Sequence, residues 1–462
     1  MTIPTPAVPL ARIGSESPAV DVLPTPPLAL IRGTSRARVN ALWIPFLGSA
    51  LIVGASFFST PPLAESVSGK AALDASLRLS LAYKVLAPIC DTLDTISLFS
   101  QGQHLAFLLT CAAAYATWRV MRRRRTTSVH LRRPEMESAS KALLVLLGVY
   151  ASGAMLPRPT AKLTMLSPDE VVVDFHSHTR YSWDGRSSFS PEESRRWHHA
   201  SGFDVAYITD HSTFAGAQEA ARLNPIHAGD GTVMLSGIEV RDRGNHLVVL
   251  GTDAHDRQSY SAGDLHELIF QREVEARGSR PVVLFTLPGN LKSESAMSVD
   301  GIEVSDAAPR GLSESDAQRG TILELAQAQN QAIVASSNNH GWASASPAWS
   351  VMRIHNWRAM TPAQLDTAIR RQILGDGWSA VRVIDRRAPG PVSLSGLAVT
   401  VPAAAWQMIT SISWAERVSW LCWIWASFLL ISTMRRSRIA QPSEDKVRNW
   451  GKPQWHRTAS SA

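Results

Sequence analysis

Cysteine is nearly absent from this chain of 462 residues, which has only Cys90, Cys111 and Cys422. No disulfide framework is expected, and a thiolate metal site is excluded from the long cysteine-free region between positions 112 and 421. The first 30 residues also lack the short apolar core after a basic start that marks a cleavable signal peptide. Because proline and small residues dominate there, residues 1–40 are predicted to be a disordered tail.

Charge is missing from several apolar stretches, at residues 41–58, 104–118, 142–156 and 418–433. Spanning a bilayer takes roughly 17 to 20 apolar residues. The first stretch, with 18 uncharged residues, is long enough, and the others need a few flanking residues. Buried core helices are the alternative for any single short run.

The basic residues favour membrane spans because they cluster beside these stretches. Residues 1–40, 119–141 and 434–462 carry net charges of +2, +6 and +5, whereas the whole chain carries +7, so the remainder carries −6. If all three clusters are cytoplasmic, four spans satisfy the positive-inside rule. The alternative is nucleic-acid binding by MRRRRTTSVHLRR, but a basic run directly after an apolar segment is more typical of a membrane anchor. The lipid bilayer is therefore the expected partner, and no nucleic acid is expected.

This topology divides the chain into five regions in a multi-pass protein of the cytoplasmic membrane. They are a cytoplasmic tail (1–40), a membrane region with about three transmembrane helices (41–157), a large extracytoplasmic domain (170–390), a C-terminal membrane segment (403–433) and a basic cytoplasmic tail (434–462). Residues 59–103 leave the choice between four and five spans open. A fifth span would move the large domain to the other side of the membrane.

Within residues 170–390, apolar runs typical of strands alternate with helix-like segments such as PEESRRWHHAS, DLHELIFQREVEAR and TPAQLDTAIRRQIL. The predicted strands are VVVDF, DVAYITD, TVMLSGIEV, HLVVLG, PVVLFTLPG, VDGIEV, QAIVASSNN and WSAVRVID. This alternation indicates parallel βαβ units, and about seven repeats predict an α/β barrel. The functional groups of such a barrel lie at the carboxyl ends of its strands.

The segment VVVDFHSHTRYSWDG, residues 171–185, ends a strand-like run with two histidines one residue apart. Alternate side chains of a strand share a face, so His176 and His178 can direct two imidazoles at one point. This is the spacing of a pair of metal ligands. A pair of surface histidines just past the strand is the alternative.

Further polar residues lie in or directly after the last residues of other predicted strands: Asp210, His211, Glu239, Glu303, Asn338, Asn339 and His340. His246 instead opens a strand, so it must reach the same place by a different route. Zinc, manganese and iron accept such a mixture of nitrogen and oxygen ligands. The sequence therefore predicts a divalent metal site at one rim of the barrel.

These motifs resemble a known family. DFHSHTRYSWDG, followed by AYITDHSTFAG, SGIEV and an Asn-Asn-His, is similar to the PHP (polymerase and histidinol phosphatase) domain over about residues 171–385. The resemblance implies a distorted (β/α)7 barrel that holds up to three metal ions and hydrolyses phosphoesters. In this chain transmembrane α-helices would flank the barrel.

The resemblance also implies which residues hold one to three ions: His176, His178, Asp184, His211, Glu239, His246, Asn338 and His340. Glu239 would bridge the ion at His176 and His178 to a second ion at His246. Two positions depart from the family pattern. Leu287 stands where the family often has a histidine, and Asn338 offers a neutral carbonyl oxygen where an aspartate is usual, so a mono- or dinuclear site is expected.

Three residues are candidates for catalysis. Asp210 and Glu303 can orient ligands or move protons, and a structural hydrogen-bonding role is the alternative for each. Arg310 can contact a phosphate, and a solvated loop arginine is the alternative. His198, His199 and His255 are interpreted as surface residues.

The leading hypothesis is a membrane-anchored, metal-dependent phosphoesterase that uses metal-activated water on a phosphorylated substrate. One alternative is a catalytically impaired binding or sensory module of the same fold that recognises an envelope phosphate ligand. In that module Leu287 and Asn338 mark decay of the metal site. Another alternative is a cytosolic phosphatase linked to a polymerase or to histidine biosynthesis, which fits the motifs but not the membrane spans.

Overall fold

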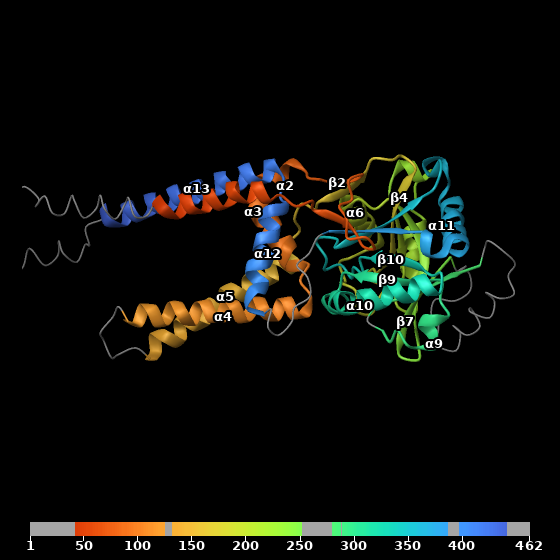
Figure 1. Ribbon diagram of the computed structural model, residues 1–462, viewed down its shortest axis with the longest axis horizontal. Helices are drawn as coiled ribbons and strands as arrows, with labels where there is room; N and C mark the ends of the chain where they lie inside the picture. The colour runs from red at the N-terminus through yellow and green to blue at the C-terminus, as the bar shows by residue number, and fades with distance from the viewer. Residues whose placement is uncertain (1–41, 125–131, 252–279, 288, 387–396, 441–462) are drawn as a thin grey trace, which may run out of the picture.

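The computed structural model describes residues 42–124, 132–251, 280–287, 289–386 and 397–440. A curled sheet with its own helices forms one end of the molecule, and a group of long helices projects from one side of it (Figure 1). Residues 1–40 and 441–462 of the predicted tails lie outside the described residues. So do the predicted helix DLHELIFQREVEAR and His255.

Twelve strands are present among the described residues. They are β1 (Leu63–Glu65), β2 (Ala75–Arg78), β3 (Lys162–Met165), β4 (Glu170–Ser177), β5 (Val205–Ile208), β6 (Val233–Asp242), β7 (Asn245–Leu250), β8 (Val282–Phe285), β9 (Gly301–Asp306), β10 (Ala332–Ser336), β11 (Ala348–Arg353) and β12 (Arg382–Arg386). Ten of them form one sheet in the order β1-β12-β11-β4-β5-β6-β7-β8-β9-β10, and β2 pairs with β3. Strand β11 is absent from the predicted strands.

The sheet is mixed, which departs from the predicted succession of parallel βα units. Strands β4, β5 and β6 are parallel, and so are β8, β9 and β10. Strand β7 is antiparallel to both of its neighbours because Arg243 and Gly244, both with positive φ, make a tight β6–β7 hairpin. Strands β11, β12 and β1 add an antiparallel extension beside β4.

The sheet curls so that its last strand, β10, returns to β4. The backbone N–H of Asn338 donates to the carbonyl of His176 at 2.8 Å, and a parallel bridge joins Ser177 to Asn339. The protein thus has a mixed α/β fold with a curled, barrel-like sheet. This curvature brings the residues that follow β10 beside the residues that end β4.

The valine run of β4 is apolar on both faces because both faces are covered. Val171, Val173 and Phe175 belong to the large core between the sheet and its helices. Val172 points the other way, into a second cluster with Trp349. A strand buried on both sides reads as a continuous apolar run rather than an alternating one.

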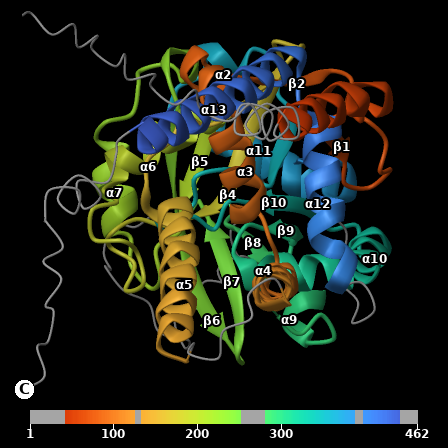
Figure 2. The same cartoon turned by 90° about the vertical axis from the view of Figure 1, so that its left-hand side faces the viewer.

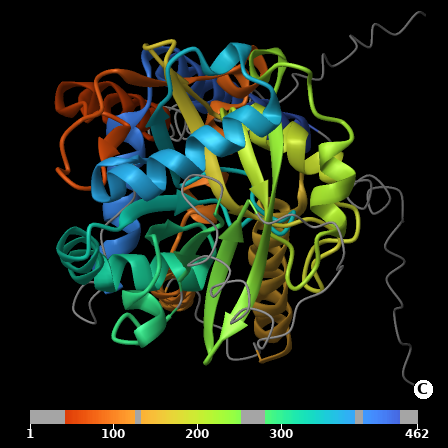
Figure 3. The same cartoon turned by 90° about the vertical axis from the view of Figure 1, so that its right-hand side faces the viewer.

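The helices that accompany the sheet lie between β4 and β12 in the sequence. Those of four or more residues are α6 (Pro191–Ser201), α7 (Ala215–Ala221), α9 (Glu294–Met297), α10 (Pro309–Ala328) and α11 (Pro362–Asp376). The predicted Thr-Pro start of α11 is confirmed, and Thr361 and Gln364 form a capping box there. Figure 3 shows α11 in front of the sheet, on the side away from the long helices. Helix α6 starts at a Ser190 cap and ends at Gly202, whose φ is 94°.

The long helices are Leu42–Phe58, α4 (Gln101–Arg124), α5 (Arg132–Met155) and α13 (Trp414–Ala440). They extend away from the sheet in two pairs, Leu42–Phe58 with α13 and α4 with α5 (Figure 1). Helix α12 (Leu397–Ser411) crosses between the two pairs near the sheet, as Figure 2 also shows.

Among the described helices, the stretch Trp414–Met434 is the one that is long and apolar enough to cross a membrane. The helix Leu42–Phe58 is apolar but shorter. The other two predicted spans fall within α4 and α5, whose charged ends lower their hydropathy. The prediction of about three transmembrane helices over residues 41–157 is therefore not confirmed by helix length and composition.

The segment 59–103, which left the number of spans open, contains no long apolar helix before α4 begins at Gln101. It folds as β1, β2 and two short helices, α2 (Leu81–Val85) and α3 (Ala87–Ser97). Strand β1 pairs with β12 of the main sheet. This segment is consequently part of the junction between the sheet and the long helices, and it contains no candidate membrane span.

Candidate metal centre

The predicted ligands come from five strands and the loops that follow them. His176 lies at the end of β4 and His178 directly after it, His211 follows β5, Glu239 lies on β6 and His246 on β7. His340 lies in the loop after β10, which the curl of the sheet returns to β4. The carboxyl ends of parallel strands share one rim, so these loops meet there.

Glu239 is the centre of the cluster, and its side chain is almost completely buried. Its Oε2 atom lies 3.1 Å from Nε2 of His176, 3.2 Å from Nε2 of His178 and 3.2 Å from Nδ1 of His211. Its Oε1 atom lies 2.5 Å from Nδ1 of His246. One carboxylate therefore meets four imidazoles from three segments of the chain.

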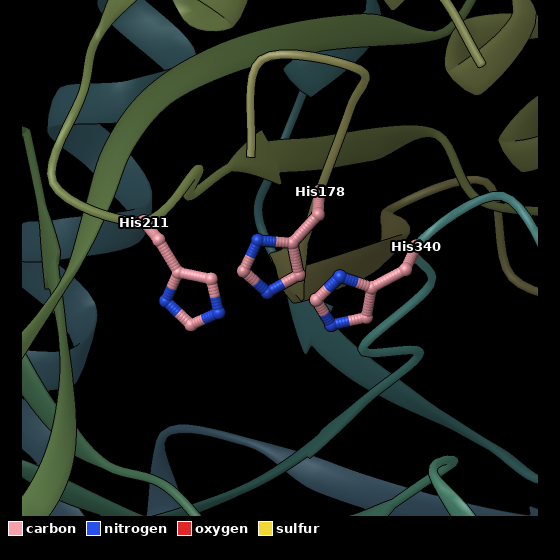
Figure 4. A group of neighbouring side chains, drawn as sticks. All are labelled: His178, His211 and His340. Atoms are coloured by element: carbon pink, nitrogen blue, oxygen red, sulfur yellow. The ribbon is translucent and has the colours of Figure 1, made fainter. Parts of the chain in front are cut away.

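The imidazole rings of His178, His211 and His340 lie side by side (Figure 4). The rings of His178 and His340 are stacked with centroids 4.0 Å apart, and His211 lies 4.8 Å from His178. Asp184 joins this group, because its carboxylate oxygens lie 3.4 Å from Nε2 of His211 and 3.1 Å from Nδ1 of His340. The second part of the predicted ligand set is thus also gathered at the rim.

Asn338 contacts the cluster through His340. Its side-chain oxygen lies 3.0 Å from Nε2 of His340, and its amide donates to Oδ2 of Asp306 at 3.1 Å. Its backbone has a φ of 40°, a conformation that asparagine tolerates better than most residues. The amide is therefore placed at the edge of the donor group, between His340 and a buried carboxyl.

Glu303 lies behind His176. Its Oε1 atom is 2.8 Å from Nδ1 of His176 and also accepts a hydrogen bond from the Ser336 hydroxyl. The backbone N–H of Leu287 donates to its other oxygen at 2.9 Å. Glu303 is therefore placed to orient the ring of His176. The Leu287 side chain lies in the apolar core, so this position presents no ligand atom.

Asp210 and Arg310 lie apart from the donor atoms. The backbone N–H and the hydroxyl of Thr179 donate to the Asp210 carboxylate at 2.6 and 2.7 Å, which fixes the loop after His178. Arg310 is on the exposed first turn of α10 and pairs with Glu314 at 3.6 Å. These contacts favour a structural hydrogen-bonding role for Asp210 over a catalytic one. They likewise favour a solvated arginine at position 310 over a phosphate contact.

Burial keeps most of the imidazoles neutral. It lowers the pKa of His340 to about 4 and also lowers the pKa values of His178 and His211. His176 differs, because Glu239 and Glu303 outweigh its burial and raise its pKa. Burial raises the pKa of Glu239, but His176 and the other imidazoles reverse this effect and hold it well below the usual value. At neutral pH the site therefore presents neutral imidazoles from His178, His211 and His340, together with a protonated His176 that faces the ionised Glu239 carboxylate.

This donor set fits divalent metal ions. Three groups each have their donor atoms within 4.8 Å of one another: His176, His178 and Glu239; His211, Glu239 and His246; and His178, His211 and His340. Nδ1 of His340 is buried and makes no hydrogen bond among the described residues. Lone pairs that converge in this way suit a cation between them, and neutral imidazole with carboxylate suits zinc, manganese or iron.

The interpretation of His198 as a surface residue is wrong. His198 is fully buried, its Nε2 atom lies 2.8 Å from Oδ2 of Asp174, and its Nδ1 atom lies 2.7 Å from the carbonyl of Ser194. Asp174 also accepts hydrogen bonds from the backbone N–H groups of His176 and Ser337. Its neighbour His199 is exposed, as predicted.

Asp174 and Asp306 are buried carboxyls that the sequence did not single out. Asp174 alternates with His176 along β4, which was the available signal. Burial and the neighbouring Glu303 raise the pKa of Asp306 to about 8. Asp306 ends β9, at the same rim as the other groups.

No family model matches this chain, and no curated protein matches it. Several solved structures are similar to it. PsfC from Pseudomonas syringae is 12% identical, with a TM-score of 0.32 over 51% of this chain and 96% of that one. A two-domain protein from Bacteroides vulgatus, which contains a predicted PHP-like metal-dependent phosphoesterase, is 14% identical, with a TM-score of 0.29 over 43% and 63% of the two chains.

A protein from Bifidobacterium adolescentis described as a candidate metal-dependent phosphoesterase is 17% identical, with a TM-score of 0.28 over 48% of this chain and 98% of that one. At this level of similarity, none of these structures assigns a family or an activity to the chain. What the fold and the site define is a mixed α/β protein with a histidine and carboxylate cluster suited to divalent metal ions.

Proposed function

We propose that this protein is a membrane-anchored, metal-dependent phosphoesterase. The observation that carries the proposal is the single buried carboxylate of Glu239, which lies within about 3 Å of nitrogen atoms from His176, His178, His211 and His246. A carboxylate shared in this way suits two neighbouring cations, and paired cations are typical of enzymes that cleave phosphate esters.

The residues that would hold the ions fall into overlapping sets. His176, His178 and Glu239 would hold one ion, and His211, Glu239 and His246 a second. A third would take His340 and Asp184 together with ring nitrogens from the first two sets. Because His178 and His211 are shared, one to three ions are accommodated.

Bound divalent metal ions supply Lewis acidity, which makes water a nucleophile near neutral pH and offsets the negative charge on phosphoryl oxygens. The chain's own residues prepare the site. Glu303 accepts the Nδ1 proton of His176, so the Nε2 atom, which lies 3.1 Å from Glu239, would give its lone pair to an ion once the Nε2 proton is released. The Asp210 carboxylate holds the backbone N–H and hydroxyl of Thr179, which fixes the loop that carries Asp184.

The first experiment uses the full-length protein in detergent, loaded with manganese or zinc. It should retain metal and hydrolyse a generic phosphomonoester or phosphodiester such as a nitrophenyl phosphate. His176→Ala should lose metal and turnover, whereas His199→Ala, which changes an exposed histidine on α6, should keep both. Failure of the wild-type protein to turn over any substrate across a metal panel would contradict the proposal.

A catalytically impaired binding module is the second candidate, and the position of Leu287 favours it. Leu287 packs in the core beside Glu303 and adds no donor atom where the PHP pattern often has histidine. This candidate predicts substoichiometric metal and phosphate binding without turnover. Metal analysis by mass spectrometry together with a phosphate-binding titration separates the two candidates.

The membrane part of the proposal is supported by exposed apolar side chains on the projecting helices. Trp43, Leu144 and Leu430 have exposed fractions of 65%, 66% and 61% in three different helices. Such side chains on helices that project together are typical of contact with lipid. We propose that both helix pairs enter the bilayer, and that α12 lies at its surface.

The same arrangement supports an extracytoplasmic location for the sheet. The ends of α4 and α13 that lead into the arginine-rich segments point away from the sheet (Figure 1). By the positive-inside rule, that end is cytoplasmic. Reporter fusions should give an external signal at residue 160 and a cytoplasmic signal at residue 440. A cytoplasmic signal at residue 160 would contradict this topology.

A further inference from the structure

Beside the metal-ligand candidates, two loops are fixed against each other. The backbone N–H of Arg186 donates to the carbonyl of His340 at 2.9 Å. Gly341, with a φ of 88°, lets the loops approach closely: a Cβ atom there would lie 2.6 Å from Cβ of Phe189 and 3.0 Å from Cβ of Arg186. Arg186 is therefore held at a defined place next to His340.

The side chain of Arg186 is oriented by an aromatic ring. Its Cζ atom lies 5.2 Å from the ring centroid of Trp342, and the indole is 46% exposed. A guanidinium over an indole face makes a favourable cation–π contact and loses part of its freedom before a ligand arrives. The contact leaves the N–H groups at the edge of the guanidinium available to donate.

The positive charge of Arg186 pairs with no carboxylate among the described residues, which sets it apart from its neighbour Arg180. Arg180 also lies over an aromatic ring, that of Tyr181, but it forms an ion pair with Glu219 at 3.1 Å. The loop after His178 thus carries one neutralised arginine and one arginine that is still able to pair with an anion.

Arg186 is also within reach of a ligand in front of the imidazoles. It is two residues from Asp184, whose carboxylate contacts His211 and His340. Two residues span at most about 7 Å, and an arginine side chain is of similar length. The guanidinium can therefore approach an anion that sits against the rim of the cluster.

We propose that Arg186, held over Trp342, binds the non-bridging oxygens of the substrate's phosphoryl group and gives the site a preference for phosphomonoesters. This inference rests on the proposed phosphoesterase function. Guanidinium donates two parallel hydrogen bonds to a phosphate, a geometry that the point charge of lysine does not reproduce. A monoester presents more free oxygens and more charge than a diester, so it gains more from this contact.

The test compares full-length, metal-loaded wild-type protein with Arg186→Gln, Arg186→Lys and Arg180→Gln. Calorimetry measures the binding of inorganic phosphate, kinetics measures kcat and KM for a monoester and a diester, and mass spectrometry measures metal content. Loss of one charge-assisted contact corresponds to about a 10- to 100-fold loss of affinity. Arg186→Gln should weaken phosphate binding and raise the monoester KM by at least about 10-fold, with a smaller change in kcat and in the diester KM.

The control variants sharpen the result. Arg186→Lys should restore only part of the affinity, and Arg180→Gln should leave phosphate binding and metal content unchanged, since its charge is already paired. Equal phosphate affinity in wild type and Arg186→Gln would overturn the inference, as would a loss of metal in Arg186→Gln. If phosphate binding depends on Arg186 but no ester is hydrolysed, the assignment of Arg186 as a phosphate-binding residue stands, whereas the monoester preference and the phosphoesterase proposal fall. Absence of phosphate binding to the wild type would overturn the inference.

Discussion

Glu239 and His246 meet across the tight β6–β7 hairpin, with Oε1 of Glu239 2.5 Å from Nδ1 of His246. Arg241 lies directly opposite His246, and Glu239 is two residues from Arg241, so both side chains share one face of the antiparallel pair. A residue at the start of a strand thereby reaches the rim where the other strands end.

This relationship predicts different metal stoichiometries for two variants. His246→Ala should lose one ion and keep the ion at His176 and His178, because those donors do not depend on β7. Glu239→Gln should lose most of the metal, since two of the three donor groups share its carboxylate. Metal analysis of the purified protein checks both, with the exposed His355→Ala as control. Equal metal content in all variants would exclude Glu239 as the shared ligand.

Glu303 should affect metal affinity without being a ligand. It orients His176 by accepting a hydrogen bond from Nδ1. Loss of a hydrogen bond to a metal ligand typically weakens metal binding 10- to 100-fold. Glu303→Gln should therefore show weaker metal binding in a competition titration with a chelator. Glu294→Gln, which changes an exposed glutamate paired with Arg243, should bind metal as the wild type does. Complete loss of metal in Glu303→Gln would instead indicate direct ligation.

The buried Asp174–His198 pair should matter for stability. The two ring nitrogens of His198 lie 2.7 Å from the Ser194 carbonyl and 2.8 Å from the Asp174 carboxylate, and all of these groups are buried. Removing one partner of a buried hydrogen bond costs about 1 to 3 kcal/mol. His198→Ala should therefore lower the Tm measured by tryptophan fluorescence, while His199→Ala leaves it unchanged. An unaltered Tm in His198→Ala would show that the pair contributes little.

Asp204 should make stability depend on pH. Burial raises its pKa to about 6, although the backbone N–H of Val172 donates to it and opposes the shift. The folded state holds this proton more tightly than the unfolded chain does. This tighter binding of the proton to Asp204 stabilises the folded state fully below about pH 4. The stabilisation is lost as the pH rises to about 6 and the carboxyl ionises.

Asp204→Asn should remove this loss, because its side-chain oxygen can still accept from Val172 and carries no charge. Above pH 6 the variant should be more stable than wild type by on the order of 2 kcal/mol, with little difference near pH 4. Chemical denaturation at the two pH values measures the effect. The exposed Asp230→Asn provides the control, and a constant difference between Asp204→Asn and wild type at both pH values would contradict the assignment.

Local signals in the sequence were sufficient for several elements. The valine run of β4 and the capped start of α11 are properties of neighbouring residues, and both are observed. The spacing of His176 and His178 likewise depends only on the alternation of a strand. Strand β11 was not predicted, although it pairs with both β4 and β12. Its place depends on partners far away in the chain.

The membrane prediction also combines local signals in the sequence with features that depend on the tertiary structure. Apolar composition marked residues 41–58 and 418–433, and the latter belongs to the helix stretch that is long enough to span a bilayer. The charged residues at the ends of α4 and α5 shorten the apolar parts of these two helices. Only the three-dimensional arrangement places the four helices on one side of the sheet (Figure 1).

The sequence by itself determined which groups are available: histidines and carboxylates at strand ends, no cysteine among them, and two alternating histidines on one strand face. The tertiary structure decided which of these groups meet. It brought His246 to Glu239 through an antiparallel hairpin, brought His340 to His178 through the curl of the sheet, and placed Arg310 on an exposed helix. The reason is physical: a side chain's type is a local property, whereas the distance between two side chains depends on strand pairing across the whole fold.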